Sequence, residues 1–190
     1  MPKKIYNPHD RFFRLAMGNI EIAQDLFKAN LPQKVLAEID LGTLAIQSGS
    51  FVDEELKQSQ TDILYHVKLK GDGKTGYLYI LAEHQSTPEK IMAFRMIKYT
   101  FSIMQQHLNQ GHQTLPLVYG LIVYTGKQTP YPYSTSLFDL FDRKALAQEI
   151  LYQPFQLINV SEFSKKTIQS QRLARIIIAR RKTSSFMARM

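Results

Sequence analysis

The sequence predicts an α/β fold in which a mixed central sheet is flanked by helices. Three patterns indicate this class: two strand-like segments on either side of Asp72-Gly73, a long amphipathic helix after the second segment, and another apolar strand after that helix. A strand, a helix and a second strand form a crossover unit, which makes the two strands parallel within one sheet. The hairpin adds an antiparallel pair, so the sheet is expected to be mixed.

The first element is predicted to be a helix that ends at Leu31-Pro32, because apolar residues recur at three- and four-residue spacing. The residues of this pattern are Phe13, Ala16, Met17, Ile20, Ala23, Leu26 and Phe27. A second, short helix is expected from Pro32 to about Glu38. Polar connections should follow it, through residues 46–50.

Segments 60–70 and 76–85 are the expected hairpin strands, since they are rich in Ile, Leu, Tyr and Val. If Asp72-Gly73 are the central pair of a two-residue turn, the numbers of paired residues sum to 145. Asp62 would then face Glu83. A longer loop, or a slip of one residue, would turn Glu83 onto the other face, so a hairpin with simply solvated acids stays open as the alternative.

The second half of the chain begins with a long amphipathic helix from Pro88 to about Gln110-Gly111. Residues 115–124 are almost all apolar, which is typical of a strand buried on both faces. A loop is expected at 130–133, a short helix within 137–150 and a further strand at 154–160.

Composition limits the class of protein. A chain of 190 residues, of which 44% are hydrophobic, is long enough for one buried core. The sequence has no apolar run long enough for a membrane span and no signal-peptide pattern at its start, so we expect a cytoplasmic protein. The absence of cysteine excludes disulfides, thiolate zinc sites and a cysteine nucleophile.

The net charge of +8 is concentrated at the end of the chain. Residues 161–190 hold eight basic residues and one acidic residue, whereas residues 1–160 hold 16 basic and 15 acidic residues. We therefore predict one domain over 1–160 and a basic C-terminal tail over 161–190. Such a tail raises nonspecific affinity for nucleic acid, although a solvated end is the commoner meaning of a basic run.

The predicted chemistry centres on the hairpin. Opposed carboxylates repel each other in a sheet, and a bound divalent cation offsets that repulsion. Asp62, Glu83 and the backbone carbonyl of His84 are all oxygen donors, which favours Mg²⁺ or Mn²⁺ over zinc. Gln85 shares the strand face of Glu83 and would orient a water or a phosphate, while the side chain of His84 points the other way.

Arg95 and Tyr99 stand four residues apart on the predicted long helix and therefore share one of its faces. Arginine suits phosphate binding, so the pair is expected to position the substrate. The alternative is a helix pair that covers apolar surface. The five histidines show no metal-ligand spacing on a shared face.

Several short motifs, which extend in order over residues 8–160, resemble one known family: the recombination-promoting nuclease (Rpn) or YhgA-like putative transposase family, within the PD-(D/E)XK nuclease superfamily. The matching motifs are His9-Asp10, Leu31-Pro32, Phe51-Val52-Asp53, Thr61-Asp62-Ile63-Leu64-Tyr65, Glu83-His84-Gln85-Ser86, Phe94-Arg95-Met96-Ile97-Lys98-Tyr99, Leu115-Pro116-Leu117-Val118 and Tyr124-Thr125-Gly126.

The resemblance implies a PD-(D/E)XK restriction-endonuclease-like core of the order α-β-β-β-α-β, with Asp62, Glu83 and Gln85 at the positions of the superfamily signature. It further implies a Mg²⁺-dependent DNA endonuclease linked to recombination or mobile elements, with a homodimer as one possible assembly. Gln85 stands where the superfamily usually has lysine, so the metal must supply more of the charge. Some members of the superfamily take a further acid from the helical region, and here Glu21, Asp25 or Glu38 could supply it.

The chain also departs from the family. It has no tryptophan, whereas members usually carry one after the proline at the position of Pro130, and the acidic helical continuation expected after residue 164 is replaced by basic residues. We hypothesise that this end is truncated or frameshifted.

Two alternative functions stay open. One is a noncatalytic DNA-binding or protein-interaction remnant of the family, and the other is an RNA-binding domain that uses the tail.

Overall fold

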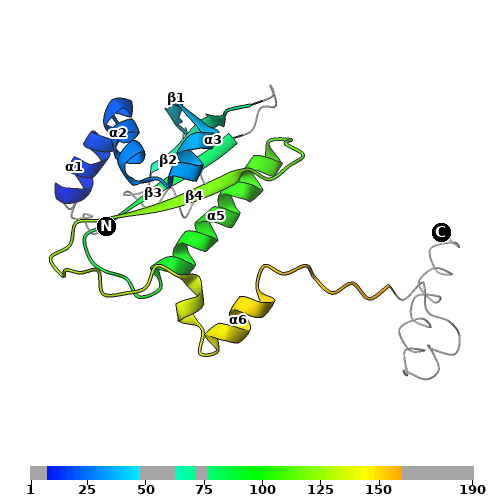
Figure 1. The fold of residues 1–190 in the computed structure, drawn as a ribbon. Coiled ribbons are helices and arrows are strands. Elements are labelled where there is room, and N and C mark those ends of the chain that lie inside the picture. The colour runs from blue at the N-terminus through cyan, green and yellow to red at the C-terminus, as the bar shows by residue number, and fades with distance from the viewer. Residues whose placement is uncertain (1–7, 48–62, 72–76, 160–190) are drawn as a thin grey trace, which may run out of the picture. The chain divides into compact units, whose positions relative to one another are not determined.

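The computed structural model describes three stretches of backbone, residues 8–47, 63–71 and 77–159. Within them it describes all side chains except those of residues 8–10, 77, 78, 81 and 83. Residues 1–144 form one compact unit and residues 145–190 another. In the first unit a four-stranded mixed sheet carries helices on both faces (Figure 1), which confirms the predicted α/β class. The domain boundary at residue 160 stays a prediction.

Two helices, α1 (Pro8–Met17) and α2 (Ile20–Asn30), form the N-terminal part. The prediction of one continuous helix was wrong because Gly18 and Asn19 interrupt it. The Asn19 side chain caps α2, since its oxygen accepts the backbone N–H groups two and three residues later at 2.8 and 3.4 Å. Of the predicted apolar residues the two helices bury Phe13, Met17, Ala23 and Phe27, and the other three are partly buried.

The short helix α3 (Gln33–Glu38) confirms its prediction, but the polar connection expected after it is a strand, β1 (Ile39–Ile46). Its pairing with the next strand shifts register between Asp40 and Ala45. There the Asp40 carboxylate accepts the N–H of Gly42 at 3.0 Å, a local bond that competes with the ladder. This irregularity breaks the alternation of apolar and polar residues, which is why the strand was missed.

The predicted hairpin is formed by β2 (Ile63–Leu69) and β3 (Tyr77–Gln85), which pair antiparallel. Ile63 lies opposite Ala82, and every described pair along this ladder has residue numbers that sum to 145. The predicted register is therefore confirmed for the described residues. Asp62, the next residue before β2, lies outside them.

The crossover prediction is also confirmed. After β3 the chain enters α5 (Met92–Asn109) and returns as β4 (Leu117–Tyr124), parallel to β3, so that the strand order is β1-β2-β3-β4. The prediction that this last strand is buried on both faces was wrong. β4 is the terminal strand of the described sheet, and none of its residues is buried; Leu117 is 60% exposed.

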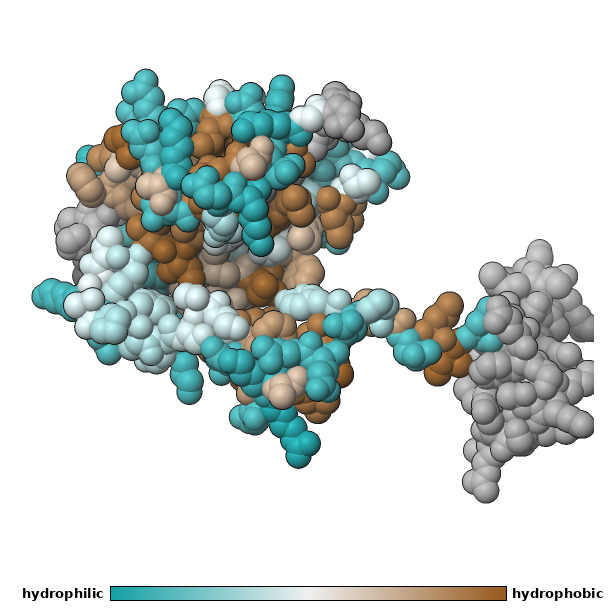
Figure 2. Space-filling view, in the orientation of Figure 1, coloured by the Kyte–Doolittle hydropathy of each residue, from teal (hydrophilic) through white to brown (hydrophobic). Residues whose placement is uncertain are grey.

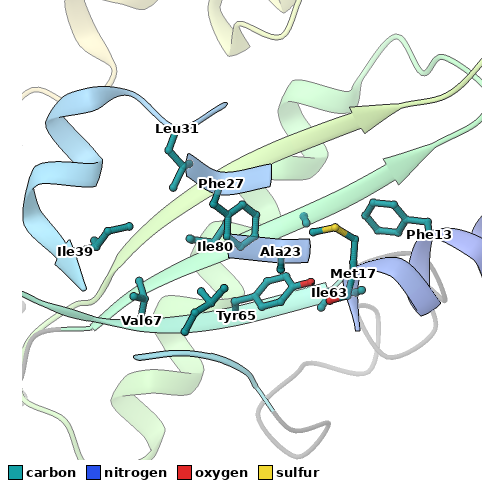
Figure 3. Packing of buried hydrophobic residues seen from close by; sticks show 12 residues of the cluster. Phe13, Met17, Ala23, Phe27, Leu31, Ile39, Ile63, Tyr65, Val67 and Ile80 are labelled. Carbon is teal, nitrogen blue, oxygen red and sulfur yellow. Dashed lines mark hydrogen bonds between the residues drawn. The ribbon is translucent and has the colours of Figure 1, made fainter. Parts of the chain in front are cut away.

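Two apolar clusters lie on opposite faces of the sheet. On one face α1 and α2 pack against β1, β2 and β3, with Phe27 and Tyr65 both fully buried at the centre (Figure 3). The Tyr65 hydroxyl donates to the carbonyl of Met17 at 2.5 Å, and burial raises the pKa of Tyr65. On the other face α5 packs against the sheet through residues that include Met92, Met96, Tyr99 and Ile103.

At the end of α5 lies a small group of polar rings. The Tyr79 hydroxyl and Nδ1 of His107 are hydrogen-bonded at 3.1 Å, and the ring of His112 stacks on that of His107 with centroids 3.8 Å apart. Burial, and to a lesser degree the charge of His112, lowers the pKa of His107. Buried His107 therefore favours its neutral form.

The region after β4 differs in part from its prediction. The expected loop around residue 131 is present, and the expected helix within 137–150 is two short pieces, η1 (Leu137–Leu140) and α6 (Lys144–Ile150). The strand expected at 154–160 was wrong over its described part, residues 154–159, where Phe155 is 100% exposed and no strand forms. A strand needs a hydrogen-bonded neighbour, and none of the described strands pairs with this segment.

Apolar residues also reach the surface on the face that Figure 2 shows. Large exposed ones in the first unit include Phe12, Leu15, Phe94 and Phe101. Among the described helices, none combines the length and the apolar character that crossing a bilayer requires.

Candidate functional site

Three strand ends meet at one edge of the sheet. Because β2 and β3 are antiparallel while β3 and β4 are parallel, the start of β2 lies beside the ends of β3 and β4. The described residues at this edge are Ile63, Gln85 and Tyr124, and the backbone of Glu83 pairs with Ile122. The predicted ligand Asp62 and the side chain of Glu83 lie outside what the structure describes, so their roles stay predictions.

His84 is held on the sheet face that α1 covers. Its side chain is only 2% exposed, and its ring stacks on that of Phe13, with centroids 4.7 Å apart and planes inclined by 18°. A hydrogen bond of 2.8 Å joins Nε2 of His84 to the hydroxyl of Thr125. The imidazole is therefore engaged in packing, and its predicted contribution to a metal site is limited to the backbone carbonyl.

Gln85 is buried, with 9% of its surface exposed, and its backbone carbonyl accepts the N–H of Thr125 at 2.9 Å. A neutral amide tolerates this burial better than the ammonium group of a lysine, which loses hydration free energy when it is buried. The predicted role of Gln85 in orienting water or phosphate stays a prediction.

Arg95 and Tyr99 occupy different environments although they share a face of α5. Tyr99 is buried in the cluster between α5 and the sheet, so for this residue the structure favours the alternative of covering apolar surface. The guanidinium of Arg95 forms an ion pair with the carboxylate of Glu89. Glu89 is held in turn by Tyr131, whose hydroxyl donates to the Glu89 carbonyl at 3.2 Å. A phosphate at Arg95 must therefore compete with Glu89.

The three candidate helical acids are all exposed. Glu21 lies in the first turn of α2, and Glu38 ends α3. The Oδ1 atom of Asp25 lies 3.8 Å from Nζ of Lys28. Among the described side chains, which omit those of Asp62 and Glu83, no group of three or more His, Cys, Asp or Glu residues lies close enough together to hold a metal ion.

A pocket opens beside this edge, between the segments that leave β3 and β4. Its volume is about 390 Å³, and it is lined by Ser86, Thr87 and Pro88 from one segment and by residues 124–128 from the other. The second segment carries the exposed ammonium group of Lys127.

The sequence showed the Thr125-Gly126 motif but gave no sign that Thr125 bonds to His84 or that Glu89 pairs with Arg95, because these contacts depend on how the loops fold.

The comparisons agree with the motifs. The family described as "Putative transposase, YhgA-like" matches residues 7–185. The recombination-promoting nuclease RpnC of Escherichia coli K12 is 42% identical over 154 residues, which cover 81% of this chain and 51% of the relative. The nuclease RpnA of the same organism is 39% identical over 170 residues, covering 90% of this chain and 58% of the relative.

A third relative from Escherichia coli K12, the inactive recombination-promoting nuclease-like protein RpnE, is 37% identical over 155 residues, or 82% of this chain and 51% of the relative. The chain thus spans about half the length of the curated relatives it matches. No solved structure matches it significantly. Since the family match extends over almost the whole chain, the protein belongs to the YhgA-like putative transposase family.

Proposed function

We propose that this chain is a metal-dependent DNA endonuclease with a PD-(D/E)XK core that acts in recombination or in the biology of mobile elements. The names of the relatives RpnC and RpnA support a nuclease, and the order of elements, helices followed by β1-β2-β3-α5-β4, is the α-β-β-β-α-β order expected of that core. Fold alone does not fix an activity, so the proposal depends on the site at the sheet edge.

The register of the hairpin carries the proposal. Ile63 pairs with Ala82, and the next pair of residue numbers along the same ladder is Asp62 and Glu83. Extending the ladder by that one pair would bring both carboxylates to one face at the open edge of the sheet. Two acids placed so are a natural ligand pair for a hard divalent cation.

The donor chemistry fits Mg²⁺, since Asp62, Glu83 and the His84 carbonyl all offer oxygen. A bound Mg²⁺, or Mn²⁺ in its place, would supply an acidified water and would offset the negative charge that develops on the phosphate. The protein's own part is positional. Gln85 would hold the water by its amide, and Arg95 would contact the phosphate when it exchanges Glu89 for the substrate.

The test is plasmid nicking by the purified protein in Mg²⁺ and in EDTA, with Asp62→Ala and Glu83→Ala as site variants. Asp142→Ala, a change to an exposed acid far along the chain, is the matched control. We expect nicking that needs the metal, survives in the control and falls at least about a hundredfold in both site variants. Equal nicking by all four proteins would refute the assignment of the site.

A second candidate is a catalytically impaired DNA-binding or protein-interaction member of the family. The match to an inactive relative over 82% of this chain favours it. This candidate predicts no metal-dependent nicking by the wild type, together with retained binding of DNA or of a protein partner. Gln85→Lys, which supplies the charge usual in the superfamily, should restore nicking only if the missing lysine is what limits the activity.

A further inference from the structure

We propose that the pocket between the segments leaving β3 and β4 binds a backbone phosphate of the nucleic acid, next to the phosphate that is cleaved, with Lys127 as its charged contact. This inference rests on the proposed function, because it assigns the neighbouring part of the same substrate. The pocket, of about 390 Å³, falls within the size range of small-ligand sites.

The pocket is fixed to the proposed catalytic strand by two hydrogen bonds. The N–H of Thr125 donates to the carbonyl of Gln85 at 2.9 Å, and the Thr125 hydroxyl is 2.8 Å from Nε2 of His84. Thr125 therefore ties the segment after β4 to the two residues that follow Glu83. A ligand at Lys127 would be held at a set position relative to those residues.

Gly126 brings the two segments into close contact. A Cβ atom at this position would lie 2.3 Å from the Tyr124 hydroxyl oxygen and 2.5 Å from the backbone carbonyl oxygen of Ser86. Any side chain here would push the segments apart. Because glycine allows this approach, Ser86 and the segment carrying Lys127 line one pocket rather than two separate loops.

The chemistry of the lining favours an anion. Thr87 offers a hydroxyl, Gln128 an amide and Lys127 an ammonium group, and none of the described residues that line the pocket is acidic. Within the described part of the chain, the backbone N–H groups of Gly126, Lys127 and Gln128 make no hydrogen bond. A phosphate diester, with one negative charge and several acceptor oxygens, matches this set of donors.

The test measures binding in a cleavage-silent background. Protein carrying Glu83→Ala is titrated in EDTA against a fluorescein-labelled duplex over a range of salt, with Lys127→Gln or with Lys34→Gln added. Lys34, an exposed lysine on α3, is the matched control. At 0.1 M salt we expect Lys127→Gln to weaken binding about eightfold and to reduce the slope of log K against log salt by about 0.9, the value of one lost phosphate contact.

Lys34→Gln should leave both quantities unchanged, and Lys127→Arg, which keeps the charge, should retain the slope. The inference is overturned if Lys127→Gln and Lys34→Gln bind alike with equal slopes. Nicking by the wild type is scored separately, so the two proposals fail in different ways. If the wild type nicks DNA but Lys127→Gln binds as tightly as the control, only the assignment of the pocket is refuted. If Lys127→Gln weakens binding but the wild type does not nick DNA, only the nuclease assignment is refuted.

Discussion

Replacing Gly126 by alanine measures how closely the segments after β3 and β4 are packed. The added Cβ would lie 2.3 and 2.4 Å from two atoms of the Tyr124 side chain and 2.5 Å from the Ser86 carbonyl oxygen, where Cβ contacts below 3.0 Å are essentially never found. The Tyr124 ring packs edge-on against Tyr131 with centroids 4.9 Å apart, and the third atom is backbone, so relieving the overlap requires packed groups to shift. Overpacking of this kind costs about 1–3 kcal/mol.

The assay is urea denaturation. With a slope of about 2 kcal/mol/M, that cost lowers the midpoint by about 0.5–1.5 M. Gly120→Ala is the matched control, because its Cβ would meet only the flexible end of Met96, at 2.6 Å. We expect this control to stay within about 0.5 kcal/mol of the wild type, since the methyl group can move aside and alanine also lowers the entropy of the unfolded chain. Equal midpoints for the two variants would refute the close packing at Gly126.

Three further outcomes follow from the core. Phe13→Ala should destabilise the protein by about 3–5 kcal/mol, whereas Phe12→Ala should change the free energy of unfolding by less than about 0.5 kcal/mol, because Phe13 is 7% and Phe12 73% exposed. Similar losses in urea denaturation would contradict the orientation of α1. Tyr65→Phe leaves the buried Met17 carbonyl without its donor, so a cost of about 1–3 kcal/mol is expected in the same assay, and a neutral result would count against that bond. The lowered pKa of His107 means that the unfolded chain binds more protons than the folded one once the pH falls below about 6.5, so stability should decrease there. Thermal melts from pH 7.5 to 5.5 should show a shallower decrease for His107→Gln, and parallel curves would rule out this origin.

The elements found from the sequence are those whose signals are local. The turn predicted at Asp72-Gly73 led to the register observed for β2 and β3, and the apolar pattern of α5 led to the crossover. The errors arose where a local pattern was ambiguous or depended on distant neighbours. A helical period continued across Gly18-Asn19 although the chain turns there, and the apolar run of β4 indicated a central strand although it ends the described sheet.

For the site, sequence reasoning named chemically suitable residues but could not show their partners. Tyr99 and Arg95 share a helix face by spacing, yet one is buried against the sheet and the other is paired with Glu89, a residue outside any regular pattern. The bond between His84 and Thr125 joins residues 41 positions apart. Contacts of this length follow from the folded topology, and a single sequence carries no local signal for them.

The parallel pairing of β3 with β4 has a consequence for the order of folding. The hairpin of β2 and β3 joins residues close in sequence and can form early, whereas β4 reaches β3 only after the intervening α5 has brought the chain back. The contacts of Thr125 with His84 and Gln85 therefore close a loop of some forty residues. A partly synthesised or partly folded chain that holds only the hairpin has the proposed acids but not the pocket beside them, so the nucleic-acid binding proposed for that pocket would require the last strand to be in place.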